Sequence, residues 1–268
     1  MRKLTIIPLL FLFLPSLLAT NDNKSADAPS LGLGGASVAL ENVYANYNNQ
    51  AILGLIEATT IASSFSQNFA ITDVRVMAAL PVSFGTFGFN VSRLGTASYA
   101  DLKFGAAYAR TFGTSFSAAL QADLLSVMPS PNESSVYAFS AELALWARPL
   151  QDLTLGFHLY NFINANYALL YYDEAIPVSM KLGFGYSIFD NFLFTGELEN
   201  NSIYGTSVRG GMEYNILDQL VFRTGAASNP ALASLGLGVT LGGFQVDIAA
   251  QAVRNYGKNG AVSLSYTF

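Results

Sequence analysis

The feature that most constrains the fold of this chain is a repeated alternation of apolar and polar residues over segments of about ten residues. In the final segment, 261–268, one face would carry the apolar side chains Val262, Leu264, Tyr266 and Phe268. Ala, Ser and Thr residues occupy the positions between them. The segments 177–188, 192–199, 208–214 and 244–251 alternate in the same way. A period of two places the two sets on opposite faces of a β-sheet.

A soluble β-sandwich also alternates, so composition must decide between a sandwich and a membrane barrel. Only 12% of the residues are charged and 51% are hydrophobic, whereas soluble domains average about 25% charged residues. The apolar faces carry Phe, Tyr and Leu, and the charges fall on the polar faces. No uninterrupted run of 18 apolar residues follows residue 20, so the pattern favours strands over helices for crossing a bilayer. The chain also ends on Phe268, which resembles the assembly signal of outer-membrane barrels.

The alternation divides the chain into 14 strands, an even number as expected for bacterial barrels. The predicted strands are 58–67, 73–82, 84–94, 98–111, 115–127, 135–147, 152–162, 177–188, 191–200, 204–214, 218–227, 231–241, 243–253 and 260–268. If the last strand ends in the periplasm, short periplasmic turns alternate with longer outer connections. We therefore predict an all-β fold, a 14-stranded antiparallel transmembrane β-barrel with a short N-terminal hatch on the periplasmic side.

The N-terminus predicts export. Arg2 and Lys3 precede an apolar run from Leu4 to Leu14, and small residues follow, which is typical of a signal peptide in residues 1–20. Cleavage is expected near Ala19 or Thr20; the alternative is an uncleaved anchor helix, for which the run is short. Two of the 13 basic residues lie in this leader, so 11 remain against 18 acidic residues, a net charge of −7. Such a charge argues against a nucleic-acid partner.

Residues 21–56 precede the first clear strand and lack its alternation, and residues 21–30 are polar and expected to be flexible. Within 31–55, a glycine-rich turn is followed by an acidic position and a Tyr-x-Asn-x-Ala sequence; the residues concerned are Gly34, Gly35, Ala36, Val38, Ala39, Glu41, Tyr47, Asn49 and Ala51. This pattern resembles PorV/PorQ-type outer-membrane proteins of the FadL-like (fatty-acid transporter) superfamily. Gln50 stands where that family has proline. The stretch 176–186 resembles a second family strand.

The resemblance implies three things about the chain. Residues 31–55 would form a hatch that plugs a barrel made of residues 57–268. The hatch motif would be Gly34, Gly35, Ala36, Glu41, Asn49 and Ala51. The alternative for Gly34 and Gly35 is an ordinary flexible turn; a nucleotide-binding loop is disfavoured because Ser37 occupies the last glycine position.

Catalytic chemistry is not expected, and neither a cofactor nor a metal site is predicted. The chain has no cysteine, and His158 is its single histidine. His158 falls on the inward face of its predicted strand, where a polar lining role is the usual one. Nucleophile-elbow and zinc-protease motifs are absent from the sequence.

Charged residues at inward positions form a predicted lumen network, in which charges need partners. Its residues are Arg75, Lys103, Lys181, Glu197, Arg209, Glu213, Arg223 and Asp247, with Asp101, Asp123, Glu142 and Glu199 facing the same interior. The network is interpreted either as mutual neutralisation or as a path and anchor for the hatch near Arg209, Glu213, Arg223 and Glu197.

Three functions remain open for a multi-pass protein of the Gram-negative outer membrane, surrounded by its lipid. The PorV/PorQ resemblance implies an accessory of type IX protein secretion, with secretion components or secreted cargo as partners. The alternative is a plugged channel for small hydrophobic molecules, which predicts an apolar pocket between hatch and wall near Leu53, Leu55, Tyr160 and Phe162. A further alternative is a structural barrel without a pore. None of the three is an enzyme.

Overall fold

The computed structural model describes residues 21–68, 71–128, 134–168, 173–189 and 191–268. The predicted signal peptide lies outside these residues. Fourteen antiparallel strands close into a barrel, as predicted from the alternation. The wall strands are β1 (Thr60–Asn68), β2 (Ile71–Val82), β3 (Gly85–Gly95), β4 (Ala100–Phe112), β5 (Phe116–Met128), β6 (Val136–Leu150), β7 (Leu153–Tyr160), β10 (Ser179–Ile188), β11 (Phe192–Asn201), β12 (Gly205–Leu217), β13 (Leu220–Ser228), β14 (Ala231–Leu241), β15 (Phe244–Val253) and β16 (Gly257–Thr267).

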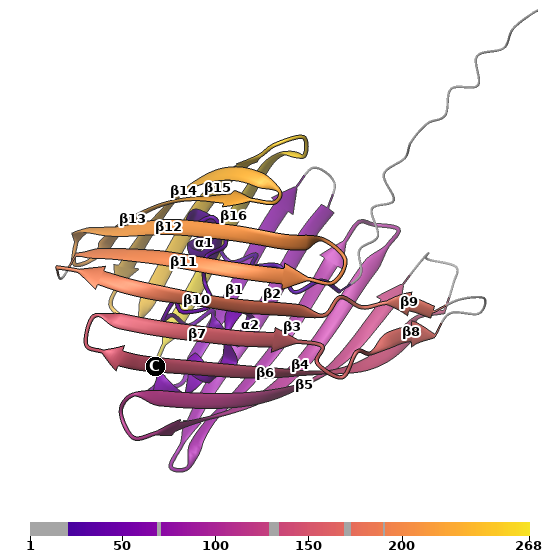
Figure 1. The fold of residues 1–268 in the computed structure, drawn as a ribbon, viewed down its shortest axis with the longest axis horizontal. Helices are drawn as coiled ribbons and strands as arrows, with labels where there is room; N and C mark the ends of the chain where they lie inside the picture. Colours follow the sequence, from indigo (N-terminus) through magenta and orange to yellow (C-terminus); the bar gives the residue numbers. More distant parts are fainter. Residues whose placement is uncertain (1–20, 69–70, 129–133, 169–172, 190) are drawn as a thin grey trace, which may run out of the picture.

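Each strand pairs with its neighbours in the chain, and β1 pairs with β16 to close the ring. β7 pairs with β10 because β8 (Asn166–Ala168) and β9 (Asp173–Ala175) form a separate two-stranded hairpin. Short turns, such as 83–84 and 218–219, gather at the end of the barrel that contains Phe268, which we call the turn end. The opposite end, with the long connection 161–178, is the loop end, and β8 and β9 project there (Figure 1).

The exterior of the barrel is apolar. On β10, exposed Met180, Leu182 and Phe184 alternate with buried Ser179 and Lys181. Aromatic rings gather toward the turn end, where Phe192 stacks on Tyr214 and Phe244 lies against Tyr266. An apolar band edged by aromatic residues is the surface that a transmembrane barrel presents to lipid.

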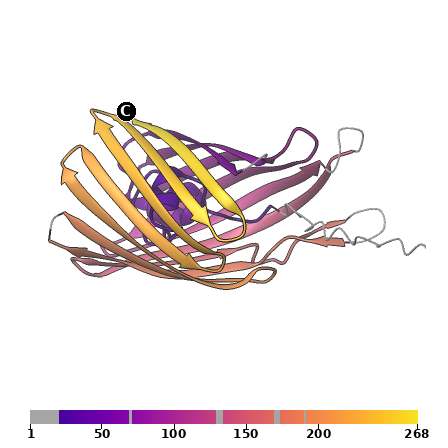
Figure 2. The same ribbon diagram turned by 90° about the horizontal axis from the view of Figure 1, so that it is seen from above.

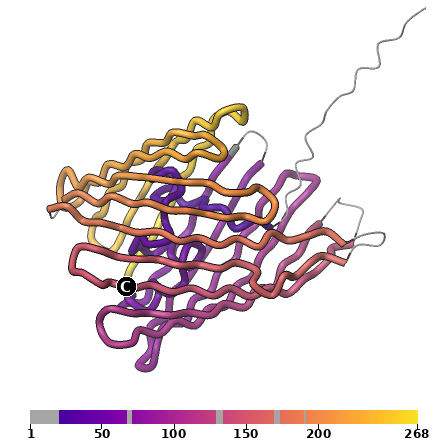
Figure 3. The backbone as a smooth tube through the Cα atoms, in the orientation of Figure 1, coloured from indigo at the N-terminus to yellow at the C-terminus, as the bar shows by residue number. Residues whose placement is uncertain are grey.

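The inner segment, residues 21–56, lies inside the ring of strands (Figure 2). Its short elements are α1 (Ala28–Gly32), α2 (Ala45–Asn48) and the 3-10 helix η1 (Gln50–Leu55). The segment runs from the loop end, where Asn21 contacts β4, toward the turn end, where Gly54 contacts Thr111 (Figure 3). Residues 21–30 were expected to be flexible. They are instead held in place by hydrogen bonds to the wall, such as the one that the Ala28 amide donates to the Ser263 hydroxyl.

Three predicted boundaries are wrong for local reasons. The strand predicted over 152–162 ends at Tyr160, because Asn161 adopts a positive φ of 54° and its side chain bonds Ala165 and Ile176. β6 and β12 extend through positions predicted as turns, each with a shift in register that keeps the pairing going. The hairpin β8–β9 was predicted as loop.

Candidate functional site

The inner segment is fitted closely to the wall, and glycines mark the line of contact. A methyl group at Gly225 would lie 2.2 Å from the carbonyl carbon of Leu33, and one at Gly156 would lie 2.1 Å from the Val38 carbonyl oxygen. Real side-chain carbons do not approach backbone so closely, so these positions accept only glycine while the segment is in place. The wall and the inner segment are therefore sterically complementary at these positions.

Residues 31–55 of the inner segment are the predicted hatch, and the residues of the predicted hatch motif form its turns and caps. Gly34 and Gly35 have positive φ of 68° and 87°, which let the chain reverse beside β12 and β13. Asn49 caps η1: its Oδ1 accepts from the Ala51 amide, and its Nδ2 donates to Val38 and Leu145 carbonyls over 2.7 and 3.0 Å. Ala36 and Ala51 are buried.

Glu41 lies apart from these residues, at the mouth of the turn end. Its carboxylate pairs with Arg148 of β6 over 2.5 Å, and both side chains are partly exposed. The Arg148 guanidinium also lies over the Trp146 ring, 5.1 Å from its centroid. This contact ties the hatch to the wall at the surface, where an ion pair stabilises only weakly.

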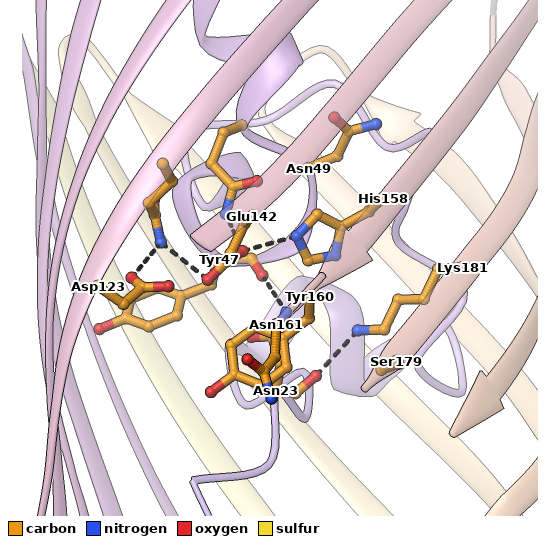
Figure 4. Close-up of polar contacts among 12 residues, drawn as sticks. Asn23, Tyr47, Asn49, Asp123, Glu142, His158, Tyr160, Asn161, Ser179 and Lys181 are labelled. Carbon is orange, nitrogen blue, oxygen red and sulfur yellow. Dashed lines mark hydrogen bonds and ion pairs between the residues drawn. The ribbon is translucent and has the colours of Figure 1, made fainter. Parts of the chain in front are cut away.

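One group of buried charges centres on Glu142 of β6 (Figure 4). Lys103 Nζ contacts Glu142 and lies 3.5 Å from Asp123, and His158 Nε2 lies 2.6 Å from Glu142 Oε2. Gln50 of the hatch donates to the same carboxylate over 2.7 Å. Lys103, predicted as a lumen charge, thus belongs to this group, whereas Lys181, also predicted, donates to the Asn23 carbonyl over 2.9 Å (Figure 4).

A second group lies on β11 to β15. Arg209 pairs with Glu197 over 3.0 Å and with Glu199, and Arg223 pairs over 2.6 Å with both Glu213 and Asp247. The same Glu197 carboxylate accepts the backbone amides of Ser37 and Val38, at 2.9 and 2.8 Å. Glu197 therefore joins the wall network to the hatch, and the predicted residues around Arg209 and Arg223 are brought together.

Arg75 completes the predicted set. It forms a two-pronged pair with Asp73 and donates to the Lys24 carbonyl over 2.7 Å. Its guanidinium lies over the ring of Tyr47, 4.5 Å from the centroid. Burial raises the pKa of Tyr47 to about 12, so this phenol is neutral at physiological pH.

Two open recesses lie on either side of hatch residues 33–39. The loop-end recess, about 410 Å³, is a shallow depression at the rim of β13 to β15. Its lining is mostly apolar but includes Arg254, and Ala227, Leu232 and Val253 form one row across the three paired strands. The turn-end recess, about 570 Å³, is more polar and includes Ser187, Leu193 and Glu213. Hatch residues Leu33 and Gly34 contact β12 and β13 between the two recesses.

The predicted apolar pocket is not formed by the residues proposed for it. Leu53 packs with Trp146 and small alanines, with Leu55 beside them, while Tyr160 packs with Leu125 and Tyr167 in a different cluster. Phe162 is exposed. The inward face alone did not indicate which residues would meet across the lumen.

Several polar residues of the inner segment that contact the wall or brace the hatch were not predicted from the sequence. They are Asn21, Asp27, Asn46, Asn48 and Gln50. The signal for Asn46, Asn48 and Gln50 is the density of amide side chains in 46–50, which is unusual for a buried segment; Asn21 and Asp27 have no such signal. Gln50, which stands where the PorV/PorQ-type sequences that the chain resembles have proline, supplies a contact that a proline side chain lacks.

Within the part of the chain that the structure describes, no helix is long and apolar enough to cross a membrane. The same residues contain no group of three or more His, Asp or Glu placed to hold a metal ion.

Comparison with solved structures shows which known proteins share this fold. The toluene transporter TodX of Pseudomonas putida superposes with a TM-score of 0.70 at 10% identity, over 92% of this chain and 99% of that chain. The toluene transporter TbuX of Ralstonia pickettii gives 0.69 at 11% identity, over 91% and 99%. The chain shares the fold of these hydrocarbon transporters.

A FadL homologue from Pseudomonas aeruginosa superposes with a TM-score of 0.64 at 12% identity, over 91% of this chain and 98% of that chain. No protein-family profile matches the sequence, and no curated protein sequence matches it. The FadL-like fold expected from the hatch residues is therefore found by structure. The finer PorV/PorQ resemblance stays a prediction.

Proposed function

We propose that this chain is an outer-membrane barrel that admits small hydrophobic molecules through a lumen closed by its own inner segment. The observation that carries the proposal is the placement of hatch residues 33–39 between an apolar recess at the loop end and a polar recess at the turn end. The shared fold with toluene transporters supports it. In the proposed orientation, the loop end faces outward and the turn end faces the periplasm.

The contacts that hold residues 33–39 suit a movable closure. Residues 33–39 carry no charged side chain. They are held by the backbone amides of Ser37 and Val38, which donate to Glu197, and by the close fit of Leu33 and Val38 against glycines of the wall. Gly34 and Gly35 leave the backbone free to change direction there. A rearrangement of this turn would join the two recesses along β11 to β13. Arg209 and Arg223, fixed by their carboxylates, would line the opened path.

The test is uptake across an intact lipopolysaccharide membrane, because hydrocarbons cross simple phospholipid bilayers unaided. A Gram-negative host lacking its own hydrocarbon channel would express the barrel or an empty vector, and entry of labelled toluene and of a sugar of similar size would be measured. Faster entry of toluene alone supports the proposal. Equal entry with and without the barrel, or faster entry of the sugar alone, would contradict it.

Secretion remains the second candidate, on the strength of the hatch residues that resemble PorV/PorQ proteins. The structural feature that favours it is the hairpin β8–β9, which projects at the loop end and exposes Asp173 and Ala175 (Figure 1). This candidate predicts that secreted proteins co-purify with the native barrel. Charge reversal at the exposed position 173, Asp173→Lys, would abolish that co-purification and leave toluene uptake intact.

A further inference from the structure

We infer that Asp101 is the binding site for the chain's own amino terminus once the predicted signal peptide has been removed. The inference is independent of what the barrel transports and rests on the predicted processing near Ala19 or Thr20. The backbone nitrogen of Asn21 donates to Asp101 Oδ2 over 3.0 Å, and both residues are buried. Processing would therefore create a new amine at, or one residue from, a buried carboxylate.

Several hydrogen bonds from the wall and its loops hold Asn21 in place. The Tyr160 hydroxyl donates to the Asn21 carbonyl over 2.7 Å, and the Asn21 side-chain amide donates to the Ser126 carbonyl and to the Tyr167 hydroxyl. The second oxygen of Asp101 accepts from the Tyr99 hydroxyl over 3.1 Å. Residues from four separate parts of the wall and loops thus converge on the start of the inner segment.

Charge balance distinguishes Asp101 among the buried acids of the wall; Asp27 of the inner segment, also buried with no basic side chain within 4.0 Å among the described residues, instead accepts from Ser30 and Asn48 as the cap of α1. The described wall strands contain a set of buried acids: Asp73, Asp101, Asp123, Glu142, Glu197, Glu199 and Asp247. Each of the others lies within 4.0 Å of a basic side chain, and among the described residues Asp101 has none within that distance. An unpaired buried carboxylate is strongly destabilising, because it loses its hydration without gaining a counter-ion.

The neighbouring basic residues are already committed elsewhere. Arg75 and Lys103 line the same small polar cavity as Asn21 and Asp101, but they pair with Asp73 and with Asp123 and Glu142. The cavity, about 20 Å³, has room for one water molecule. An ammonium group at this point has three N–H donors, so it could bind Asp101 and still reach a water there.

Removal of the leader supplies the missing charge. Hydrolysis of the peptide bond by a signal peptidase consumes one water, leaves a carboxylate on the released leader, and leaves an amine on the mature chain. The amine takes up a proton at neutral pH, since α-amino groups have a pKa of about 7.7–8.0. Before cleavage the Asn21 nitrogen is an uncharged amide, so the ion pair with Asp101 forms only in the processed chain.

The test begins with the native barrel purified from membranes. Mass spectrometry of its first peptide should place the terminus at residue 20 or 21 with a free amine. In the folded barrel this amine should react with an amine-selective reagent at least tenfold more slowly than in the urea-unfolded chain, while the exposed Lys258 of β16 reacts at similar rates in both. A terminus elsewhere, a blocked amine, or an unprotected amine would overturn the inference.

The variant Asp101→Asn separates the ion pair from mere burial. It should raise the reactivity of the terminal amine and move the pH midpoint of labelling downward, because the partner that favours the charged amine is gone. Asp173→Asn, which removes a carboxylate from the exposed hairpin, is the matched control. If both variants leave the midpoint where the wild type has it, Asp101 is not the partner.

A second comparison does not depend on the Asp101→Asn barrel folding well. The wild-type mature chain, refolded with its terminal amine free or acetylated, differs by one charge and keeps the Asn21 amide. The acetylated chain should unfold at a lower temperature. Equal unfolding temperatures would overturn the inference.

Discussion

Gln50 of the inner segment donates its side-chain amide to Glu142 of β6 over 2.7 Å, and both residues are closed to solvent. Glu142 also contacts Lys103, His158 and Gln121. One hatch side chain is therefore part of the charge network that neutralises the wall. Gln50, which stands where the PorV/PorQ-type sequences that the chain resembles have proline, is thus one of the residues that link the hatch to the wall.

Replacing Gln50 with alanine should destabilise the barrel by about 1–3 kcal/mol, because a hydrogen bond to a buried charged group is lost. Urea unfolding in detergent micelles would measure the change. Gln219→Ala, in an exposed turn, is the control and should match the wild type. Equal stability of the two variants would show that the Gln50 contact does not support the wall.

Replacing Glu197 with glutamine should loosen the hatch while the barrel stays closed. The change removes the charge that holds Arg209 and weakens the acceptor of the Ser37 and Val38 amides. Hydrogen exchange of residues 36–40 should quicken by more than tenfold, and exchange of the wall strands should not change. The exposed Glu57→Gln is the control; quickened exchange in both variants would indicate a general effect of charge.

Two adjacent glycines on β12 provide a matched pair. A methyl group at Gly211 would lie 2.7 Å from the Leu33 carbonyl oxygen, whereas one at Gly210 would have its nearest neighbour at 3.8 Å. Gly211→Ala should displace the hatch and admit large antibiotics into cells. Gly210→Ala should leave cells as resistant as the wild type. Resistance in both would mean that the close fit at Leu33 does not keep the lumen closed.

Leu120 on β5 tests the exterior surface. It is 59% exposed on an apolar face, and an arginine facing lipid costs about 2–4 kcal/mol at the middle of the bilayer. Leu120→Arg should reduce the yield of folded barrel in outer-membrane fractions, read as the heat-modifiable band on gels. Thr114→Arg, in a turn, should fold normally. Normal folding of Leu120→Arg would place that face in water.

The sequence predicted the wall because successive side chains of a strand point to opposite faces, so a strand with one polar face and one apolar face alternates in sequence. The inward side chains of β10, β11 and β15, including Lys181, Glu197 and Asp247, could be assigned to the interior from this period alone. Partners across the lumen could not be assigned, because alternation says nothing about which residues on distant strands face each other. The pairing of Arg223 with Asp247, which lie on β13 and β15, required the register of three strands.

The conformation of the inner segment could not be predicted in the same way, because it is fixed by contacts with the wall and not by a periodic pattern in its own sequence. Residues 21–30 have the composition of a flexible segment, yet Asp27 caps α1 and Asn21 bonds four parts of the wall and its loops. The pocket predicted around Leu53 and Phe162 is not formed, because contacts between the inner segment and the wall could not be predicted either. The hairpin β8–β9 is too short, at three residues a strand, for its alternation to be recognised.

In the proposed function, the inner segment must rearrange for a hydrophobic molecule to pass through the barrel. Ser25 and Ser37 lie on either side of α1 and the Gly34–Gly35 turn, with their hydroxyl oxygens 3.1 Å apart. Because the chain has no cysteine, Ser25→Cys with Ser37→Cys would form a single disulfide across the segment. The most direct measurement is toluene uptake by this double variant before and after reduction, with Ser25→Cys alone as control. Uptake that is blocked by oxidation and restored by reduction is the predicted result; undiminished uptake by the oxidised variant would contradict the account.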